Sequence, residues 1–366
     1  MTDSASEIKR CKTCILPVGF PGVSFDENGI CALCANHKPS PAPLGADVLK
    51  EKILSVASMD YDCVVPLSGG KDSSYVLYYA VKKLGLRVLA VNYNSGFQSP
   101  QATANVVNAC KSLNVPLKVF HANLNLRKSL IRQVLKFGCL TGIPTGVCGN
   151  CENAIRSYSI RAAHEAGVCN ILLGDSEAEK INIPIPTGLG GLMRRVNAKN
   201  FPGVLKALSA YYVTASRERK YMGIPAKEAF SLSMAPIAFP VDDIQVVHFF
   251  DYVPWETMNK KELLEKELGW KAACGQISRF DCYLHPLDNL GFLKQLGISK
   301  DGIIYANLVR AGIMTREQAL EQEINIQKTI RHDCLEFAKQ YGRIMMGWIG
   351  LIMIFFKTFS FICFVN

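Results

Sequence analysis

Short apolar runs alternate with amphipathic stretches along residues 63–173. The apolar runs predict strands at 63–67, 87–93, 116–121 and 170–173. The stretches between them carry apolar residues at helical spacing and predict helices at 72–84, 101–113, 125–137 and 152–166. A strand followed by a helix at this spacing indicates right-handed crossovers and a mostly parallel sheet, with ligands at the carboxyl ends of the strands.

The alternation of apolar runs and amphipathic stretches does not continue on either side of residues 63–173. We therefore divide the chain into four parts. Residues 10–37 are rich in cysteine, and closely spaced prolines then favour an extended linker that ends near residue 46. We interpret 46–180 as the strand and helix domain and 181–340 as a basic, helical region that contacts substrate and partners. Within the latter, helices are expected at 257–268 and from a capping box at Thr315 to Gln318.

The fourth part, 344–366, is nearly all apolar. It is long enough to span a bilayer, because about 20 apolar residues suffice. Lys357 lies just past its middle, where a charge costs about 3 kcal/mol. A membrane anchor, a buried helix and an atypical terminus are the alternatives for this segment.

Composition and charge narrow the class of protein. With 49% hydrophobic and 20% charged residues, the chain is neither disordered, collagen-like nor a coiled coil. Its net charge of +10 favours anionic partners such as nucleotides, sugar diphosphates, RNA or a membrane surface. The beginning of the chain has no apolar export signal, so its 14 cysteines indicate a reducing, cytoplasmic location, with membrane association through 344–366 as an addition.

The strongest local motif is Ser-Gly-Gly-Lys-Asp-Ser-Ser at 68–74, between a predicted strand and a predicted helix. Gly69 and Gly70 let the backbone approach an anion, the first helical turn offers free N–H groups, and Lys71 adds a positive charge. No Walker A pattern passes through the segment. The motif resembles the PP-loop of ATP pyrophosphatases, which bind the β,γ-pyrophosphate of ATP and split ATP into AMP and pyrophosphate.

The resemblance to this superfamily implies a set of site residues. Lys71, Asp72 and Asp175 are the candidates for catalysis, and Asp72 is expected to hold Mg²⁺ against the phosphates of ATP. Hydroxyl groups of the loop are expected to bind phosphate, Asn92 and Tyr93 to lie near the base or ribose, and Gly174 and Asp175 to lie near the reacting phosphorus. The candidates for ATP binding are Ser68, Gly69, Gly70, Lys71, Asp72, Ser73, Ser74, Asn92, Tyr93 and Gly174. For Asn92, Tyr93, Gly174 and Asp175, the alternative is that they are ordinary loop residues without a role in ATP binding.

Two cysteine motifs indicate metal chemistry. The first, Cys11-x₂-Cys14-x₁₆-Cys31-x₂-Cys34, has the spacing of a tetrahedral thiolate Zn²⁺ site with a structural role. His37 replacing Cys34 is a minor variant of this prediction.

The second motif, Cys148-Gly-Asn-Cys151, lies at the entrance to a predicted helix, where thiolates are favoured. A second metal site, a redox pair, an iron–sulfur cluster and a purely structural role are all open. A cluster needs a third cysteine, for which Cys139, Cys169, Cys274 and Cys282 are available. The histidines at 121, 164, 248, 285 and 332 show no ligand or triad spacing and are interpreted as structural.

Over most of 10–323 the chain resembles the N-acetyl sugar amidotransferases of surface-polysaccharide (lipopolysaccharide O-antigen) biosynthesis. The resemblance rests on the turn at 19–26 between two Cys-x-x-Cys pairs, the loop at 68–73, the Cys148/Cys151 pair, and less specific matches at 254–255, 268–271, 279–280 and 312–320. It implies an α/β fold, with a parallel-sheet PP-loop (adenine nucleotide α-hydrolase-like) domain, an N-terminal zinc module and a helical C-terminal region. It also implies that ATP adenylylates the acetamido oxygen of a nucleotide-linked sugar and that ammonia displaces AMP to give an acetamidino group.

The sequence also bears on the source of the ammonia. The chain has no Gly-x-Cys-x-Gly motif, since the segment around Cys148 lacks the final glycine, and no cysteine follows Met1. Separate glutaminase and cyclase-like subunits are therefore the expected partners.

At 272–276 the chain lacks the cation and histidine that the family usually carries after Gly-Trp-Lys. The alternatives are a PP-loop thiolase that modifies tRNA and a catalytically inactive PP-loop scaffold.

Overall fold

The structure is a computed structural model, and it describes residues 8–38, 41–56, 60–141, 147–175, 201–222, 243–255, 260–272 and 281–342. The predictions for the apolar segment 344–366 and for Cys274 lie outside these residues, as do parts of the region 181–340, including 181–200 and 223–242. None of the described helices is both long and apolar enough to cross a membrane.

The core of the fold is a five-stranded parallel sheet, in the order β3-β2-β1-β4-β5. Its strands are β1 (Cys63–Pro66), β2 (Val88–Asn94), β3 (Leu117–His121), β4 (Asn170–Leu173) and β5 (Gln245–His248). The chain places β2 and β3 on one side of β1 and then returns to place β4 on the other. This reversal creates a switch point at the carboxyl ends of β1 and β4, where ligands bind in open parallel sheets.

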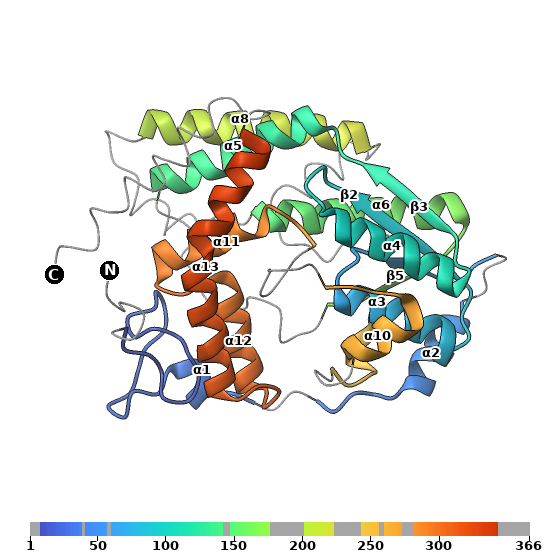
Figure 1. The fold of residues 1–366 in the computed structure, drawn as a ribbon, viewed down its shortest axis with the longest axis horizontal. Coiled ribbons are helices and arrows are strands. Elements are labelled where there is room, and N and C mark those ends of the chain that lie inside the picture. Colours follow the sequence, from blue (N-terminus) through green and yellow to red (C-terminus); the bar gives the residue numbers. More distant parts are fainter. Residues whose placement is uncertain are drawn as a thin grey trace.

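Helices cover both faces of the sheet (Figure 1). On one face, Cys63 and Val65 of β1 pack against α2 (Ala46–Leu54), α3 (Lys71–Tyr78), α4 (Pro100–Leu113) and α10 (Lys260–Leu268). On the other face, α6 (Val147–Ala166) packs against the alternate strand residues, which include Val64 and Val91. Because both faces are buried, these strands read as continuous apolar runs, as expected for a parallel sheet.

The predicted α/β fold with its parallel sheet is confirmed. The segment predicted as one helix over 72–84 is α3 followed by a turn of π-helix, η1 (Tyr79–Lys83). The fifth strand, β5, was not expected and belongs to the part of the chain assigned from sequence to the basic, helical region. It is followed by the short 3₁₀ helix η3 (Phe249–Asp251), which adds Phe249 to the core.

A second layer of helices lies beyond the sheet. Helices α5 (Leu124–Thr141) and α8 (Phe201–Met222) pack side by side along one edge of the molecule (Figure 1). Helices α11 (His285–Leu296), α12 (Lys300–Arg310) and α13 (Arg316–Gly342) form the helical C-terminal region. The predicted capping box is present at the start of α13, because Thr315 and Gln318 exchange side chain to backbone hydrogen bonds of 3.0 and 3.2 Å.

The cysteine-rich module at the N-terminus, with the short helix α1 (Ala32–Ala35), packs against α12 and α13 (Figure 1). Ile15, Leu16 and Phe20 are buried there with Ile303 and Ala319. The module is therefore not an independent appendage, since its apolar side chains complete the core of the C-terminal helices.

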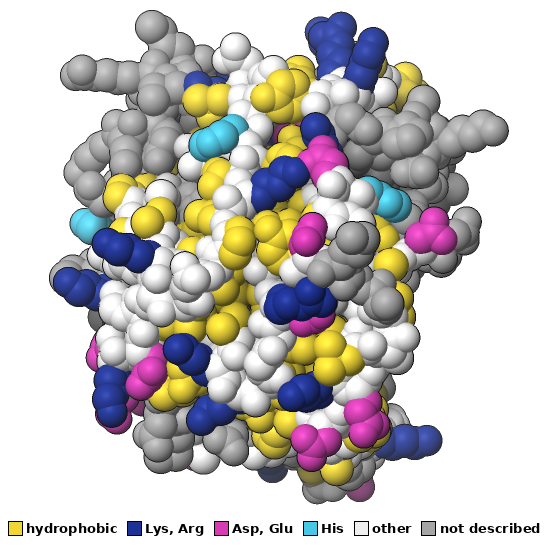
Figure 2. Space-filling view, turned by 90° about the vertical axis from the view of Figure 1, so that its right-hand side faces the viewer, with side chains coloured by type: hydrophobic (Ala, Val, Ile, Leu, Met, Phe, Trp, Pro, Cys, Tyr) yellow, Lys and Arg dark blue, Asp and Glu magenta, His cyan; other side chains and the backbone are white. Residues whose placement is uncertain are grey.

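Charge on the surface is mixed on the face that carries α4 and α10. Figure 2 shows lysine and arginine side chains spread among acidic and apolar ones on that face. Among the side chains drawn there, the net positive charge of the chain does not gather into one continuous basic patch.

Candidate active site

The PP-loop residues lie at the carboxyl end of β1, at the switch point of the sheet. The loop runs through Ser68, Gly69 and Gly70, and α3 begins at Lys71. Gly69 has φ +84°, and a Cβ atom there would lie 2.1 Å from the carbonyl oxygen of Ala102 on α4. Only glycine fits this position, because the backbone conformation and the close helix both exclude a side chain.

Serine hydroxyls hold the loop in its shape. Ser73 Oγ lies 3.1 Å from Ser68 Oγ and accepts a hydrogen bond of 3.2 Å from the backbone N–H of Ser68. The N–H of Gly70 donates to Ser68 Oγ at 3.2 Å. Ser74 is fully buried beneath the loop, and its hydroxyl has no hydrogen-bond partner among the described residues. Ser68 and Ser73 therefore shape the cradle, while Ser74 supports it from below.

The carbonyl groups of the loop are held from three other places in the chain. Gln98 donates to the Ser68 oxygen at 3.2 Å. The Gly69 oxygen accepts from Asn105 on α4 at 3.2 Å and from the indole N–H of Trp270 at 3.0 Å. These bonds, together with the one from the Gly70 N–H to Ser68 Oγ, hold the loop in one conformation just before the first turn of α3.

The Gly-Trp-Lys segment at 269–271 is tied to the loop by a second contact. The N–H of Lys271 donates to Asn105 Oδ1 at 3.0 Å, and the amide of Asn105 returns a bond of 2.9 Å to the Lys271 oxygen. This segment entered the sequence resemblance only as a weak match. In the structure this segment is bonded to the loop through Trp270 and to α4 through Lys271.

Charged groups line the start of α3. Asp72 Oδ1 lies 3.6 Å from Nζ of Lys260, the first residue of α10. Lys260 is only 3% exposed, and its ammonium lies 4.6 to 5.1 Å from the ring centroids of Tyr75, Phe250 and Trp255. Aromatic faces and a carboxylate together offset the cost of burying this cation. Lys71 lies at the same place, with Nζ 6.0 Å from the Trp255 ring.

The donors present fit a divalent cation bound with a polyphosphate. Asp72 Oδ1 is buried and has no hydrogen-bond partner within the described part of the chain. A second carboxylate, Asp281, has an oxygen 3.5 Å from the position that a Cβ on Gly70 would take. Carboxylate oxygens beside a phosphate cradle are the usual protein ligands of Mg²⁺.

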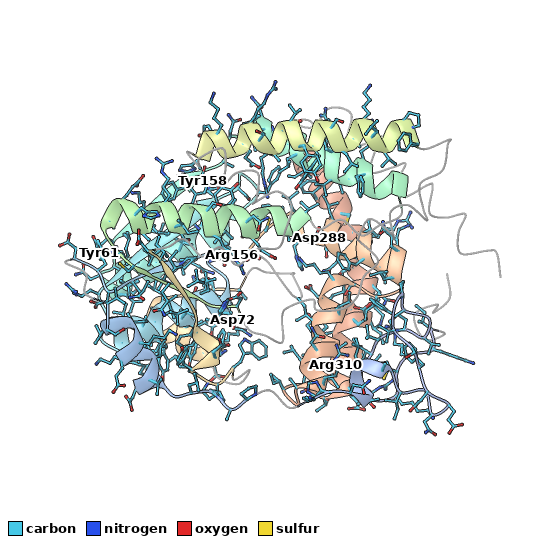
Figure 3. All side chains as sticks on the ribbon, turned by 180° about the vertical axis from the view of Figure 1, so that it is seen from behind. Tyr61, Asp72, Arg156, Tyr158, Asp288 and Arg310 are labelled. Carbon is cyan, nitrogen blue, oxygen red and sulfur yellow. The ribbon has the colours of Figure 1, made fainter. Side chains whose placement is uncertain are left out.

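Gly174 and Asp175 follow β4 on the opposite side of the switch point. A Cβ on Gly174 would lie 2.9 Å from Val76 Cγ2, so the end of β4 touches α3. Asp175 is hydrogen-bonded to His248 Nδ1 at 2.8 Å and to Arg156 at 3.3 Å. In Figure 3, Arg156 on α6 and Asp72 on α3 lie on the side of the sheet that faces the C-terminal helices.

The surroundings of Asp175 favour its ionised form. Burial raises the pKa of Asp175, but the hydrogen bond from His248 and the charges of His248 and Arg156 outweigh it, so the pKa lies below the ordinary 3.8. His248 ends β5, and Arg156 comes from the middle of α6. No sequence signal pointed to either residue, because each is brought to Asp175 only by the order of the strands.

Asn92 and Tyr93 lie on β2. The amide of Asn92 is buried and donates to the Leu67 oxygen at 2.7 Å, which fixes the residue before the loop. The Tyr93 ring stacks on Tyr158 of α6 with centroids 5.3 Å apart. Both side chains have structural contacts in the fold, and their contact with a base or ribose stays a prediction.

The four N-terminal cysteines meet as the spacing predicts. The donor sulfur atoms of Cys11, Cys14, Cys31 and Cys34 all lie within 4.8 Å of one another. Four thiol donors at this separation fit a tetrahedral Zn²⁺ site. Arg310 of α12 donates to Cys14 Sγ at 3.3 Å, and Arg316 of α13 donates to the Cys11 and Cys14 oxygens at 3.2 and 3.1 Å. These cations face the negative charge that a zinc tetrathiolate would carry.

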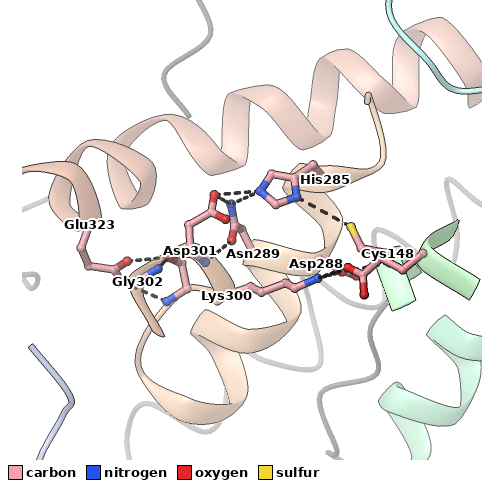
Figure 4. Close-up of polar contacts among 10 residues, drawn as sticks. Cys148, His285, Asp288, Asn289, Lys300, Asp301, Gly302 and Glu323 are labelled. Carbon is pink, nitrogen blue, oxygen red and sulfur yellow. Dashed lines mark hydrogen bonds and ion pairs between the residues drawn. The ribbon is translucent and has the colours of Figure 1, made fainter. Parts of the chain in front are cut away.

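Cys148 and Cys151 lie on the first turn of α6, away from the N-terminal cysteines. Cys148 Sγ is 3.7 Å from His285 Nδ1 (Figure 4), and Cys151 accepts a hydrogen bond from the buried Arg127. Of the additional cysteines considered, Cys282 lies near His285, whose N–H donates to the Cys282 oxygen at 3.2 Å, and Cys169 precedes β4. The side chain of Cys139 and all of Cys274 fall outside the described residues.

Comparisons with known proteins place the chain near two solved structures. No family model matches the chain, and no curated protein matches it. It is similar to the NMN synthetase from Francisella tularensis, with 17% identity over 78% of this chain and 91% of that one, and a TM-score of 0.32. It is also similar to an NH3-dependent NAD synthetase from Campylobacter jejuni, with 15% identity over 53% of this chain and 95% of that one, and a TM-score of 0.29. Identities and TM-scores this low assign no activity.

Proposed function

We propose that this chain is an ATP-dependent, AMP-forming amidotransferase that acts on a nucleotide-linked N-acetyl sugar. The observation that carries the proposal is the pairing of an anchored PP-loop with Asp175, His248 and Arg156 across the switch point between β1 and β4. The loop offers a place for a pyrophosphate group. The opposite side offers a carboxylate, an imidazole and a cation.

ATP binding is assigned to the loop and its surroundings. The β- and γ-phosphates lie on the N–H groups at the start of α3, with Lys71 beside them. Asp72 and Asp281 would hold Mg²⁺, which would neutralise phosphate charge. We assign Arg156 to the α-phosphate, and its contact with Asp175 at the carboxyl end of β4 supports this assignment.

The reaction has two steps. The acetamido oxygen attacks the α-phosphorus of ATP, the bond to the β-phosphate oxygen breaks, and pyrophosphate leaves. Ammonia then attacks the activated carbon, loses a proton, and AMP leaves with the former amide oxygen. The net change replaces oxygen by NH and gives an acetamidino sugar. The protein positions the reactants and stabilises the charge that develops on phosphorus.

His248 is assigned the proton transfer in the second step. Its Nδ1 donates to Asp175, which leaves Nε2 as the acceptor for the proton that the attacking ammonia loses. Asp175 orients the ring through this hydrogen bond. Ammonia is assigned to a separate glutaminase with a cyclase-like partner subunit, because the sequence has no glutaminase motif of its own.

One observation supports a second candidate. The N–H of His285 donates to the Cys282 oxygen and its ring lies 3.7 Å from Cys148 Sγ, and a third cysteine near Cys148 and Cys151 is what a sulfur-transferring PP-loop enzyme that acts on tRNA would need. The amidotransferase is our first proposal because it rests on the loop and on the contacts of Asp175 with His248 and Arg156 at the switch point.

The proposal is tested by the products of ATP cleavage. The purified full chain, given ATP, Mg²⁺, ammonium and a nucleotide-linked N-acetyl sugar, is expected to form AMP and pyrophosphate in equal amounts. Lys71→Ala is expected to abolish this activity. Lys82→Ala is the matched control, since Lys82 is exposed at the far end of the same helical segment. Equal loss of activity in both variants, or release of ADP instead of AMP, would contradict the proposal.

A further inference from the structure

Lys260 is a buried cation beside the phosphate cradle. It is the first residue of α10, which packs against α3 (Figure 1), and only 3% of its surface is exposed. Its Nζ lies 4.8 Å from the ring centroid of Tyr75, 4.6 Å from that of Phe250 and 5.1 Å from that of Trp255. The rings come from α3, from η3 and from the segment after η3, so three parts of the chain enclose one ammonium group.

Packing alone does not explain a lysine at this position. Removing an ammonium group from water is unfavourable, and an apolar side chain of similar length, such as methionine, would contact the same rings without that cost. The neighbouring Lys261 shows the usual arrangement of a lysine, since its side chain is 63% exposed and lies 3.8 Å from Glu265. The buried charge of Lys260 therefore indicates an electrostatic role.

The carboxylate that Lys260 faces belongs to Asp72, the proposed Mg²⁺ ligand. Lys260 Nζ lies 3.6 Å from Asp72 Oδ1, and this oxygen atom is itself buried. The Asp72 side chain as a whole is 26% exposed, so part of it remains open to solvent. Asp72 thus has one oxygen toward a fixed cation and keeps an open side that a second cation can approach.

The two lysines of the site are held differently. Lys71 is half-buried, with its Nζ 6.0 Å from the Trp255 ring, whereas Lys260 is enclosed by the rings of Trp255 and its neighbours. Lys71 is therefore accessible to a phosphate group. Lys260 acts on the carboxylate of Asp72, the charged group that lies next to it.

The charges of the side chains at the cradle offset one another. Asp72 and Asp281 are acidic, and Lys71 and Lys260 are basic. Because these formal charges cancel, a free divalent cation gains little net attraction there. The ammonium of Lys260 also repels such a cation, and water screens this repulsion poorly because the ammonium is buried. The negative charge of a polyphosphate on the loop reverses the balance.

We propose that Lys260 is a positioning residue that makes Mg²⁺ binding at Asp72 depend on a bound polyphosphate. Its ammonium orients the carboxylate and offsets its charge, so Asp72 does not take up a divalent cation by itself. Once phosphates lie on the loop, their charge outweighs that of Lys260, and Asp72 accepts Mg²⁺ beside them. The inference rests on the proposed assignment of ATP and Mg²⁺ to this site, and it adds the order in which they bind.

The test measures Mn²⁺ binding to the full chain with and without ATP, through the electron spin resonance signal of the free ion. Mn²⁺ prefers the same oxygen ligands as Mg²⁺. The wild type is expected to bind Mn²⁺ weakly without ATP and far more tightly with it. Lys260→Met keeps the side-chain length and removes the charge. It is expected to bind Mn²⁺ about tenfold more tightly without ATP, and to bind metal-free ATP about tenfold more weakly.

Two further variants control the measurement. Lys261→Met removes the neighbouring exposed lysine and should behave as the wild type. Lys260→Met combined with Asp72→Asn should lose the Mn²⁺ binding that is independent of ATP, which would locate that binding at Asp72. A purely structural role of Lys260 would change the thermal unfolding of Lys260→Met and leave its affinity for Mn²⁺ without ATP unchanged.

The outcomes separate this inference from the proposed function. Equal Mn²⁺ affinity of the wild type and Lys260→Met without ATP, in chains that bind ATP, would overturn the role of Lys260 and leave the ATP site in place. If Lys260→Met does not fold, the wild type decides, since tight Mn²⁺ binding without ATP that Asp72→Asn removes would overturn the inference. A wild type that binds no ATP, with or without Mn²⁺, would overturn the proposed function and this inference with it.

Discussion

The indole N–H of Trp270 donates a hydrogen bond of 3.0 Å to the carbonyl oxygen of Gly69, across 201 positions of the chain. Trp270 is itself buried in the core that α3, α4 and α10 share. The conformation of the phosphate cradle is therefore coupled to the packing of a distant segment. This coupling makes the loop rigid before any nucleotide binds.

Removing this bond should weaken nucleotide binding without unfolding the protein. Trp270→Phe keeps an aromatic ring in the core but leaves the Gly69 oxygen with Asn105 as its remaining side-chain donor. A lost hydrogen bond of about 1 kcal/mol corresponds to about fivefold weaker ATP binding. Calorimetric titration with ATP and thermal unfolding measure the two effects separately. Unchanged ATP affinity in a folded variant would show that the bond does not organise the loop.

Gly69→Ala should be far more damaging. The added methyl group would meet the Ala102 oxygen at 2.1 Å, and the φ of +84° adds backbone strain. ATP binding and AMP formation should both be lost, because either the loop or α4 must move. Gly85→Ala is the matched control, since it has φ +69° and no atom within 4 Å of the new Cβ. It should cost about 1 to 2 kcal/mol of stability and retain ATP binding. Similar behaviour of the two variants would mean that strain, and not the contact with Ala102, is decisive.

The contacts of Asp175 with His248 and Arg156 should make the stability of the protein depend on pH in the acid range. Because its pKa is lower in the folded protein than in the unfolded chain, its contribution to stability is present above the unfolded pKa of about 3.9 and is lost as the pH falls through the folded pKa. Asp175→Asn should therefore melt below the wild type near neutral pH, and the difference should vanish in strong acid. Thermal unfolding at several pH values checks this.

His248→Gln serves as the companion variant in that experiment. It removes the histidine's charge and weakens the support of Asp175, so the acid-dependent loss of stability should begin at higher pH than in the wild type. The same midpoint in both proteins would show that His248 does not stabilise the carboxylate.

Zinc removal should act on the C-terminal helices as well as on the N-terminal module. Ile15, Leu16 and Phe20 pack against α12 and α13, and Arg310 and Arg316 bind the cysteine segment. A Cys31→Ser variant should lose about one zinc per chain and show faster amide hydrogen exchange in both α1 and α12. Fast exchange confined to the N-terminal residues would contradict this coupling.

The sequence predicted the local parts of this account because strand and helix periodicities and the loop motif are short-range signals. Such patterns predicted the strands that end near Leu67 and Leu173, the loop between β1 and α3, and the grouping of the four N-terminal cysteines. His248 and Lys260 could not be predicted in the same way. His248 meets Asp175 across 73 positions, and Lys260 meets Asp72 only because α10 packs on α3.

Contacts in the folded chain also indicate what a side chain does where a sequence motif leaves several roles open. Asn92 was expected near the base or ribose because it lies at the end of a predicted strand. In the structure its side-chain amide donates to the Leu67 carbonyl oxygen. Cys282 was one of four cysteines that could join Cys148 and Cys151, and the turn before α11 brings its backbone into contact with His285, whose ring lies against Cys148. Long-range packing selects among residues that the sequence leaves equivalent.

The central claim is that an acetamido oxygen is activated by ATP and replaced by nitrogen. The most direct test incubates the full chain with ATP, Mg²⁺, a nucleotide-linked N-acetyl sugar and isotopically labelled ammonium. The amount of AMP formed and the mass of the sugar nucleotide are measured over time. The account predicts one labelled nitrogen in the sugar for each AMP, a product lighter than the amide by the difference between O and NH, and no turnover with glutamine until a glutaminase is added. ATP cleavage that requires tRNA and sulfide and is indifferent to ammonium and to the sugar would contradict it.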